Sequence, residues 1–250
     1  MKEWIVGRNP VYEVMQARRR NMFRLIVASG VEEKGRIREI LTLAAAHKVP
    51  TEKVPREKVN ALGENPQGVA LEVSAYPYAD LGAIFERASE RHEAPFILIL
   101  DIIQNPQNLG TLLRSAEAAG MHGVIIPLRR AAEVTPAVVS ASAGASEHML
   151  IVQENLARAI ETLKKQDVWV IGLEGSEEAR KIEQVPLTGP LALVVGNEGE
   201  GMRLLVRESC DYLLKLPMRG KIESLNAAVA GSIVIYQALI ARMKQVGKPQ

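Results

Sequence analysis

Cysteine and histidine are too scarce in this sequence to build a disulfide framework or a metal centre. Cys210 is the single cysteine among 250 residues, so neither an internal disulfide nor a zinc site made of several thiolates can form. The four histidines, His47, His92, His122 and His148, lie far apart, and no two are spaced i,i+3 or i,i+4. We therefore predict that the protein binds no metal.

Long hydrophobic runs are also missing. No stretch of 18 uninterrupted apolar residues occurs, and the best candidate, 227–241, contains Gly231, Ser232 and Gln237. A segment of that length is too short to span a bilayer. The N-terminal sequence MKEWIVGRNP has no apolar core of the kind found in signal peptides. These features predict a soluble, cytoplasmic protein that does not enter a membrane.

Charge is nearly balanced over the whole chain but unevenly distributed along it. The formal net charge is +2, yet residues 1–75 carry 13 basic and 9 acidic side chains, whereas residues 76–250 carry 18 and 20. A small basic module joined to a larger, near-neutral one suggests that the first part holds an anionic partner such as RNA. The alternative is that these cations form an ordinary solvated face.

The first 75 residues have the pattern of a compact α/β unit. Proline at a first helical turn predicts a helix from Pro10 to about Ala17, and apolar spacing predicts another helix over 33–47. Strands are expected at 23–29, 51–54 and 68–73, with a short helix over 56–62. The segment YPYAD (76–80), with proline between two tyrosines, is expected to be a linker to the next unit.

From residue 96 onward, apolar runs alternate with helical or loop segments. Continuous apolar runs are typical of strands that are buried on both faces, and their alternation with helices indicates a parallel sheet. We therefore predict an α/β fold that ends in a long apolar helix over 225–244. The expected strands are 96–100, 123–127, 148–152, 168–173, 191–195 and 212–217.

Polar clusters follow three of these strands, at the edge where ligands bind in open parallel sheets. They are DIIQNPQNLGTLLRSAEAAG (101–120), GNEGEGM (196–202) and PMRGKIESLNAAVAG (217–231). No G-x-G-x-x-G dinucleotide motif and no G-K-[ST] phosphate loop is present, which argues against binding of NAD, FAD or nucleoside triphosphates of those types. The acidic Gly-rich loop favours a ligand with positive charge or ribose hydroxyls.

Individual residues of these clusters also have structural interpretations. Asn108 is expected to cap the helix that Gly120 ends, and Ser224 and Asn226 are expected to open the last helix. Arg114 is either a functional cation or an ordinary exposed arginine. Cys210 is expected in the core at the start of the sixth strand of this region.

Taken together, these clusters resemble the three motifs of the SpoU/TrmH family. The resemblance is carried by N-L-G-x-x-L-R-S-A-x-A-A-G (108–120), L-A-L-V-V-G-N-E-G-E-G-M (191–202) and L-P-M-R-G-x-I-x-S-L-N-A-A-V-A (216–230). Members of this family are S-adenosylmethionine-dependent RNA ribose 2′-O-methyltransferases of the SPOUT superfamily. The layout is most similar to enzymes that methylate a guanosine of 23S rRNA, and less similar to the shorter tRNA enzymes.

The resemblance implies a domain organisation. I-V-G-R-N-P-V-Y-E-V (5–14) and Q-G-V-A (67–70) are landmarks of the family's L30e-like substrate-binding domain. The expected layout is therefore an L30e-like RNA-binding domain at 1–75, a linker and connecting helix at 76–92, and a SPOUT methyltransferase domain at 93–250. That domain is expected to end in a trefoil knot and to form a homodimer. Pro66 and the segment 105–108 depart from the commoner family residues.

The resemblance also implies a set of site residues. The expected catalytic residues are Asn108, Arg114, Glu198, Ser224 and Asn226, and the expected S-adenosylmethionine contacts are Leu173, Gly196, Leu216, Met218 and Leu225.

The basic module supplies the candidate RNA-binding residues, which are Arg8, Asn9, Arg18, Arg19 and Arg20, joined by Arg24. The alternative for the arginine run 18–20 is an ordinary solvated loop. Two other functions stay open, a tRNA ribose 2′-O-methyltransferase and a catalytically inactive RNA-binding assembly factor. Arginine stays protonated in proteins, so Glu198 is chemically the more conventional proton acceptor.

Overall fold

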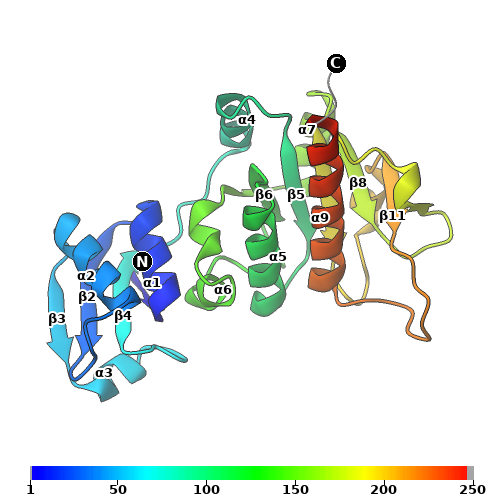
Figure 1. The fold of residues 1–250 in the computed structure, drawn as a ribbon. Coiled ribbons are helices and arrows are strands. Elements are labelled where there is room, and N and C mark those ends of the chain that lie inside the picture. The colour runs from blue at the N-terminus through cyan, green and yellow to red at the C-terminus, as the bar shows by residue number, and fades with distance from the viewer. Residues whose placement is uncertain (1, 247–250) are drawn as a thin grey trace. The chain divides into compact units, whose positions relative to one another are not determined.

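A computed structural model describes residues 2–246 of the chain, with the side chain of Val246 left out. These residues form two compact units (Figure 1). The first unit runs to Pro77 and also takes in Glu133–His148, whereas the second comprises Tyr78–Ala132 and the chain from Met149 onward.

The first unit contains a four-stranded sheet in the order β1-β4-β2-β3. Neighbouring strands are antiparallel, except that β2 and β3 are parallel. Helix α1 begins two residues earlier than the sequence predicts and ends where Arg18 adopts a left-handed conformation with φ 55°. The elements are β1 (Lys2–Val6), α1 (Arg8–Ala17), β2 (Met22–Ala28), α2 (Arg36–Ala46), β3 (Thr51–Val54), α3 (Arg56–Asn60) and β4 (Val69–Ser74).

The first unit also includes a segment from the middle of the chain, which sequence patterns did not indicate. Within Glu133–His148, helix α6 (Pro136–Ala141) packs on β1, and the short 3₁₀ helix η1 (Ala145–His148) packs on α1. Gly144 adopts φ +91°, and a Cβ at this position would lie 2.5 Å from the Cβ of Glu13. The segment and helix α1 therefore meet at a distance that only glycine permits.

The second unit is built on a seven-stranded sheet in the order β7-β6-β5-β10-β8-β11-β9, with every pairing parallel. The expected parallel α/β architecture is therefore confirmed, although the strand expected at 148–152 begins only at Ile151 and the two-residue β9 was missed. The elements are α4 (Leu81–Glu90), β5 (Phe96–Asp101), α5 (Pro106–Ala118), β6 (Gly123–Pro127), β7 (Ile151–Glu154), α7 (Leu156–Lys164), β8 (Trp169–Leu173), β9 (Arg180–Lys181), η2 (Ile182–Gln184), β10 (Leu191–Gly196), α8 (Leu204–Glu208), β11 (Tyr212–Lys215) and α9 (Ala227–Val246).

The two faces of this sheet bury alternate side chains of its strands. Ile97 and Ile99 of β5 join a cluster with residues of α4, α7 and α8, such as Ile84 and Leu163. Helices α5 and α9 pack on each other over the opposite face, where Gly231 lies against Leu112 and β10 (Figure 1). Because helices cover both faces, the strands are hydrophobic along their whole length.

Helix α9 begins and ends two residues later than the sequence predicts, at 227–246 instead of 225–244. It runs for 20 residues, and Ala227–Gln245 is long and apolar enough to cross a membrane by length and composition alone. However, its Ala228, Ile235 and Ala238 are buried in the second unit, and the hydroxyl of Ser232 lies 2.8 Å from that of Ser115 on α5. One face of α9 therefore belongs to a protein core.

Candidate functional site

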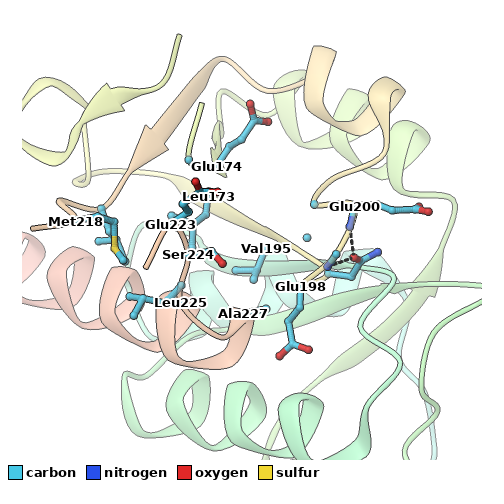
Figure 2. A pocket seen from close by; sticks show the side chains of 17 residues that line it. Leu173, Glu174, Val195, Glu198, Glu200, Met218, Glu223, Ser224, Leu225 and Ala227 are labelled. Atoms are coloured by element: carbon cyan, nitrogen blue, oxygen red, sulfur yellow. Dashed lines mark hydrogen bonds between the residues drawn. The ribbon is translucent and has the colours of Figure 1, made fainter. Parts of the chain in front are cut away.

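A cavity of about 310 Å³ opens where β8, β10 and β11 end (Figure 2). These strands are neighbours in a parallel sheet, so the loops that follow them meet at one edge. All five residues expected to contact the cofactor line this cavity, as do the expected catalytic residues Glu198 and Ser224. The full lining is Leu173, Glu174, Gly175, Val195, Gly196, Asn197, Glu198, Gly199, Glu200, Gly201, Leu216, Met218, Glu223, Ser224, Leu225, Ala227 and Ala230.

The Gly-rich loop after β10 folds back on itself at one edge of the cavity. A Cβ on Gly196 would lie 2.3 Å from the carbonyl carbon of Gly201, so the turn requires glycine at position 196. The backbone N–H of Asn197 donates to the carbonyl of Gly201 at 3.1 Å, and its side-chain oxygen accepts from the N–H groups of Gly199 and Glu200 at 2.9 and 2.8 Å. The turn is therefore held by its own hydrogen bonds.

A buried carboxylate fixes the far end of the same loop. Asp101, the last residue of β5, is fully buried and accepts from the backbone N–H and the Nε of Arg203 at 2.7 and 2.8 Å. A further guanidinium nitrogen of Arg203 lies 2.7 Å from Asp101. Sequence analysis missed this pair, because the two residues are 102 positions apart and match no motif.

Three predicted catalytic side chains meet in one hydrogen-bond network. Asn108 of α5 donates through Nδ2 to Oε1 of Glu198 at 2.6 Å, and Asn226 donates to that same carboxylate oxygen. Asn226 also donates to Oδ1 of Asn108 at 3.2 Å. Both amides hold one oxygen of the Glu198 carboxylate, and no described residue donates to the other, Oε2.

The cap of α5 differs from the prediction, whereas Asn226 opens α9 as expected. Asn105, not Asn108, caps α5 by accepting from the N–H of Gln107 at 2.8 Å, because Pro106 is the first helical residue. Asn108 therefore lies inside the helix, and its amide is available to Glu198. At α9, Oδ1 of Asn226 accepts from the N–H groups of Ala228 and Val229, which leaves its NH₂ group directed at Glu198.

Ser224 and Arg114 are not part of this network. Ser224 does not cap α9 but lies exposed in the lining of the cavity. Arg114 is exposed on α5, about two turns after Asn108, and neither lines the cavity nor bonds to another described residue. Its predicted contact with substrate stays a prediction.

Another ion pair at the cavity was also missed by sequence analysis. Glu174, which lines the cavity after β8, accepts from Nε of Arg207 on α8 at 2.8 Å. The Arg207 guanidinium lowers the pKa of the Glu174 carboxyl against the opposing effect of burial. Glu174 therefore contributes an ionised carboxylate to the cavity.

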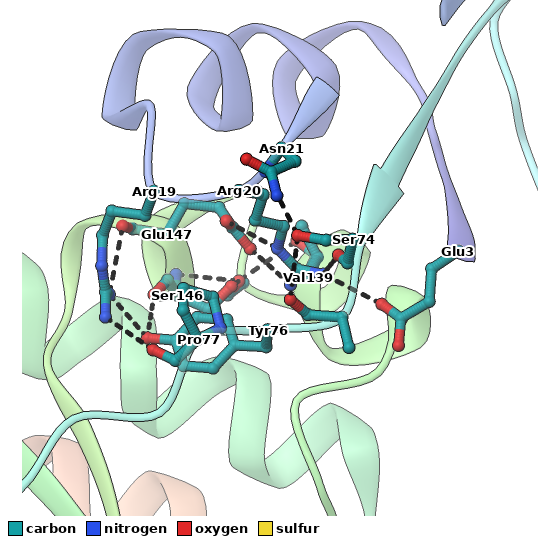
Figure 3. Close-up of polar contacts among 12 residues, drawn as sticks. Glu3, Arg19, Arg20, Asn21, Ser74, Tyr76, Pro77, Val139, Ser146 and Glu147 are labelled. Carbon is teal, nitrogen blue, oxygen red and sulfur yellow. Dashed lines mark hydrogen bonds and ion pairs between the residues drawn. The ribbon is translucent and has the colours of Figure 1, made fainter. Parts of the chain in front are cut away.

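Two of the three arginines at 18–20, Arg19 and Arg20, bind other residues of the first unit (Figure 3). The Arg20 side chain is fully buried, and its guanidinium binds the equally buried carboxylate of Glu147 at 2.8 and 3.0 Å. Arg19 donates to the hydroxyl of Tyr76 at 2.8 Å and to the carbonyl of Pro77 at 2.9 Å. The expectation that Arg20 contacts RNA is thus corrected, because its charge is enclosed in the protein.

The remaining basic candidates lie on the surface of the first unit. Arg18 and Asn9 are exposed, and Arg8 lines a cavity of about 690 Å³ together with two cations that were not among the candidates, Lys34 and Arg56. The same cavity is lined by Gly30, Val31, Glu32, Asn65 and Gln67. Only three-dimensional proximity reveals this group, because its members are spread over 60 residues of sequence.

Cys210 and Tyr76 are structural residues. The thiol of Cys210 packs against the core of the second unit, and burial raises its pKa to about 12, so it stays un-ionised and is a poor nucleophile. Tyr76, expected in a linker, is buried instead. Its hydroxyl donates to the carbonyl of Ser146 at 3.1 Å, and burial raises the pKa of the phenol to about 12.

Comparisons with known proteins identify both parts of the chain. Residues 95–236 match the model of the SpoU rRNA Methylase family, and residues 4–79 match the model described as RNA 2′-O ribose methyltransferase substrate binding. A TrmH family tRNA/rRNA methyltransferase of Bacillus subtilis is 41% identical over 240 residues, which cover 94% of each chain. A relative of the same description from Staphylococcus saprophyticus is 39% identical over 240 residues, with 95% of each chain covered.

The fold is also known from a solved structure. The SpoU methyltransferase AviRb from Streptomyces viridochromogenes, crystallised in complex with AdoMet, superposes with a TM-score of 0.80 at 24% identity, covering 97% of this chain and 91% of its own. The resemblance seen in the sequence motifs is thereby confirmed, and the chain belongs to the SpoU rRNA methylase family.

Proposed function

We propose that this family member transfers a methyl group from S-adenosylmethionine to the 2′-hydroxyl of a guanosine ribose in 23S rRNA. The observation that carries the proposal is the network in which Asn108 and Asn226 hold one oxygen of Glu198 at the edge of the cavity. A separate unit that matches a substrate-binding family model supports a large RNA as the substrate.

The composition of the cavity fits the proposed methyl donor. Its lining combines apolar side chains with the carboxylates of Glu174, Glu198, Glu200 and Glu223, and no lysine or arginine within residues 2–246 lines it. Carboxylates favour a sulfonium cation and ribose hydroxyls, and they disfavour the phosphates of nucleotide cofactors. When bound, S-adenosylmethionine supplies an activated methyl group on a positively charged sulfur, which leaves as a neutral thioether.

The chain's own residues then orient the acceptor and remove its proton. Oε2 of Glu198 would accept the proton of the 2′-hydroxyl, whose oxygen would take the methyl group that the bound donor supplies. Asn108 and Asn226 keep Oε2 in position by holding Oε1. A positioned base of this kind contributes about 10²–10⁴-fold to a rate.

Arg114 is proposed to bind the acceptor rather than to deprotonate it. A guanidinium stays protonated and is suited to gripping phosphate and stabilising a developing alkoxide. Changing Arg114 to Ala is expected to abolish detectable turnover while S-adenosylmethionine binding, measured by calorimetry, changes little. Loss of both together would contradict this role.

The direct test is methylation of RNA with labelled S-adenosylmethionine, followed by mapping of alkali-resistant positions. We expect a single 2′-O-methylguanosine in 23S rRNA. Methylation of tRNA alone would favour the tRNA enzyme, and RNA binding with no transfer to any RNA would favour the assembly factor.

The cavity of the first unit is proposed to bind RNA phosphates through Arg8 and Arg56. Each change to Ala is expected to weaken RNA binding and to reduce the slope of log K against log salt by about 0.7–0.9. Arg24→Ala is a suitable control, since Arg24 is paired with Glu72 at 3.0 Å outside this cavity. Equal losses for all three variants, in a filter-binding salt titration, would refute the assignment.

A homodimer is proposed to form through α9. Its exposed apolar side chains lie at spacings of three and four residues and so form one stripe: Val229, Ile233, Tyr236, Ile240 and Met243. Ile233→Asp is expected to yield a monomer by light scattering, whereas Leu128→Asp, at an exposed leucine outside α9, should leave the dimer intact. A wild-type monomer, or a dimer that tolerates Ile233→Asp, would contradict the proposal.

A further inference from the structure

A second cavity of the second unit shares the Gly-rich loop with the first. It measures about 480 Å³ and is lined by Ile102, Ile103, Gln104, Asn105, Asn108, Arg130, Asn197, Glu198, Gly199 and Glu200. Four of these residues, 197–200, also line the first cavity. Glu198 thus belongs to both cavities, and the network that holds its carboxylate stands where they adjoin.

Besides the Gly-rich loop after β10, this cavity is built by the loops that follow the neighbouring strands β5 and β6. The backbone N–H of Ala132 donates to the carbonyl of Ile103 at 2.9 Å, which ties the two loops together. Ile102 and Arg130 both adopt left-handed conformations, with φ 56° and 62°. Such a conformation is a true outlier for a β-branched residue, and outliers of this kind cluster at ligand-binding sites.

Arg130 is the only cation that lines this cavity in the part of the chain that the structure describes. Its exposed guanidinium makes no hydrogen bond or ion pair with another described residue, so it is available to a ligand. The other polar side chains of the lining are the amides of Gln104, Asn105 and Asn197, the Asn108–Glu198 pair and the Glu200 carboxylate. A ligand that suits this set has one anionic group, together with hydroxyl and N–H donors.

We propose that this cavity receives the target nucleotide and that Arg130 pairs with the phosphate on the 3′ side of its ribose. The 2′-hydroxyl is bonded to the carbon next to the one that carries this phosphate. A phosphate at Arg130 therefore directs the hydroxyl toward Glu198 and the methyl donor beyond it. Arginine suits this role because its planar fork binds two phosphate oxygens at once. The assignment rests on the proposed function and adds an acceptor-anchoring residue to it.

Arg129 offers a matched control for the charge of Arg130. The two arginines are adjacent and exposed, but Arg129 does not line this cavity. Arg130→Ala is expected to lower kcat/KM for RNA by about 10- to 100-fold, the loss typical of a charge-assisted hydrogen bond. Arg130→Lys should give a smaller loss, and Arg129→Ala a loss below about threefold. Calorimetric binding of S-adenosylmethionine should be unchanged in all three variants.

An RNA fragment with a neutral methylphosphonate 3′ to the target ribose locates the contact. The loss of kcat/KM that the wild-type enzyme shows with this fragment should be about as large as the loss that Arg130→Ala shows with normal RNA. For the Arg130→Ala variant, replacing normal RNA by this fragment should lower kcat/KM almost no further, because the contact is already absent. If the losses from the methylphosphonate and from Arg130→Ala are additive, or if Arg129→Ala and Arg130→Ala have equal effects, the assignment of Arg130 is wrong but the proposed function still stands. Absence of wild-type turnover would instead remove the proposed function on which it rests.

Discussion

Glu198→Gln is expected to lower kcat by about 10²–10⁴-fold, the contribution of a positioned general base. The substituted amide retains the shape of the carboxylate, and its oxygen still accepts from Asn108 and Asn226. Its NH₂ group then takes the position of Oε2, where a donor cannot accept the hydroxyl proton. Single-turnover methylation of RNA, with S-adenosylmethionine binding measured in parallel, tests this result.

The control for this variant is Glu208→Gln. Glu208 is an exposed residue of α8 that lines neither cavity. The substitution makes the same change of charge and should leave kcat within about threefold of wild type. Wild-type single-turnover rates for Glu198→Gln would exclude Glu198 as the base. A loss confined to cofactor affinity would instead assign Glu198 to cofactor binding.

Arg20→Met is expected to destabilise the first unit by about 3–5 kcal/mol, because it leaves the fully buried Glu147 carboxylate without its charge partner. Glu147→Gln should cost less, since Arg20 keeps the carboxylate of Glu3 at 2.9 Å and the carbonyl of Ser74 at 3.1 Å. The double variant Arg20→Met/Glu147→Leu should recover much of the loss, as apolar pairs often replace buried ion pairs without penalty.

The two tryptophans allow this stability to be measured for each unit. Trp4 belongs to the first unit and Trp169 to the second, so urea unfolding followed in a Trp169→Phe background reports the first unit. Arg24→Met removes a more exposed pair with Glu72 and should cost no more than about 1 kcal/mol. A loss for Arg20→Met no greater than that of Arg24→Met would show that the buried pair does not hold the unit together.

The Arg20–Glu147 pair also explains why the prediction that Arg20 contacts RNA was wrong. Three consecutive arginines in a basic module indicate a surface for RNA, and Arg18 is indeed exposed. The partner that encloses Arg20 lies 127 residues away, in the part of the chain that matches the SpoU rRNA methylase model. Burial of a charge depends on such a distant partner, so local composition could not separate Arg20 from Arg18.

By itself the sequence determined the α/β class, the parallel sheet, the positions of its main strands along the chain and the family. These follow from local properties, since continuous apolar runs mark buried strands and motif glycines such as Gly196 mark turns that a side chain would block. The five expected cofactor contacts line one cavity because they end or follow strands that are neighbours in the sheet.

Only the tertiary structure decided which groups are free to act. The caps of Asn105 and Asn226 orient the amides around Glu198, Arg20 is closed inside an ion pair, and Arg130 is left open on a cavity. Residue type and spacing are the same whether a polar side chain caps a helix, pairs with a buried charge or faces a ligand. The difference lies in hydrogen-bond partners contributed by distant segments, and these are defined only when the chain has folded.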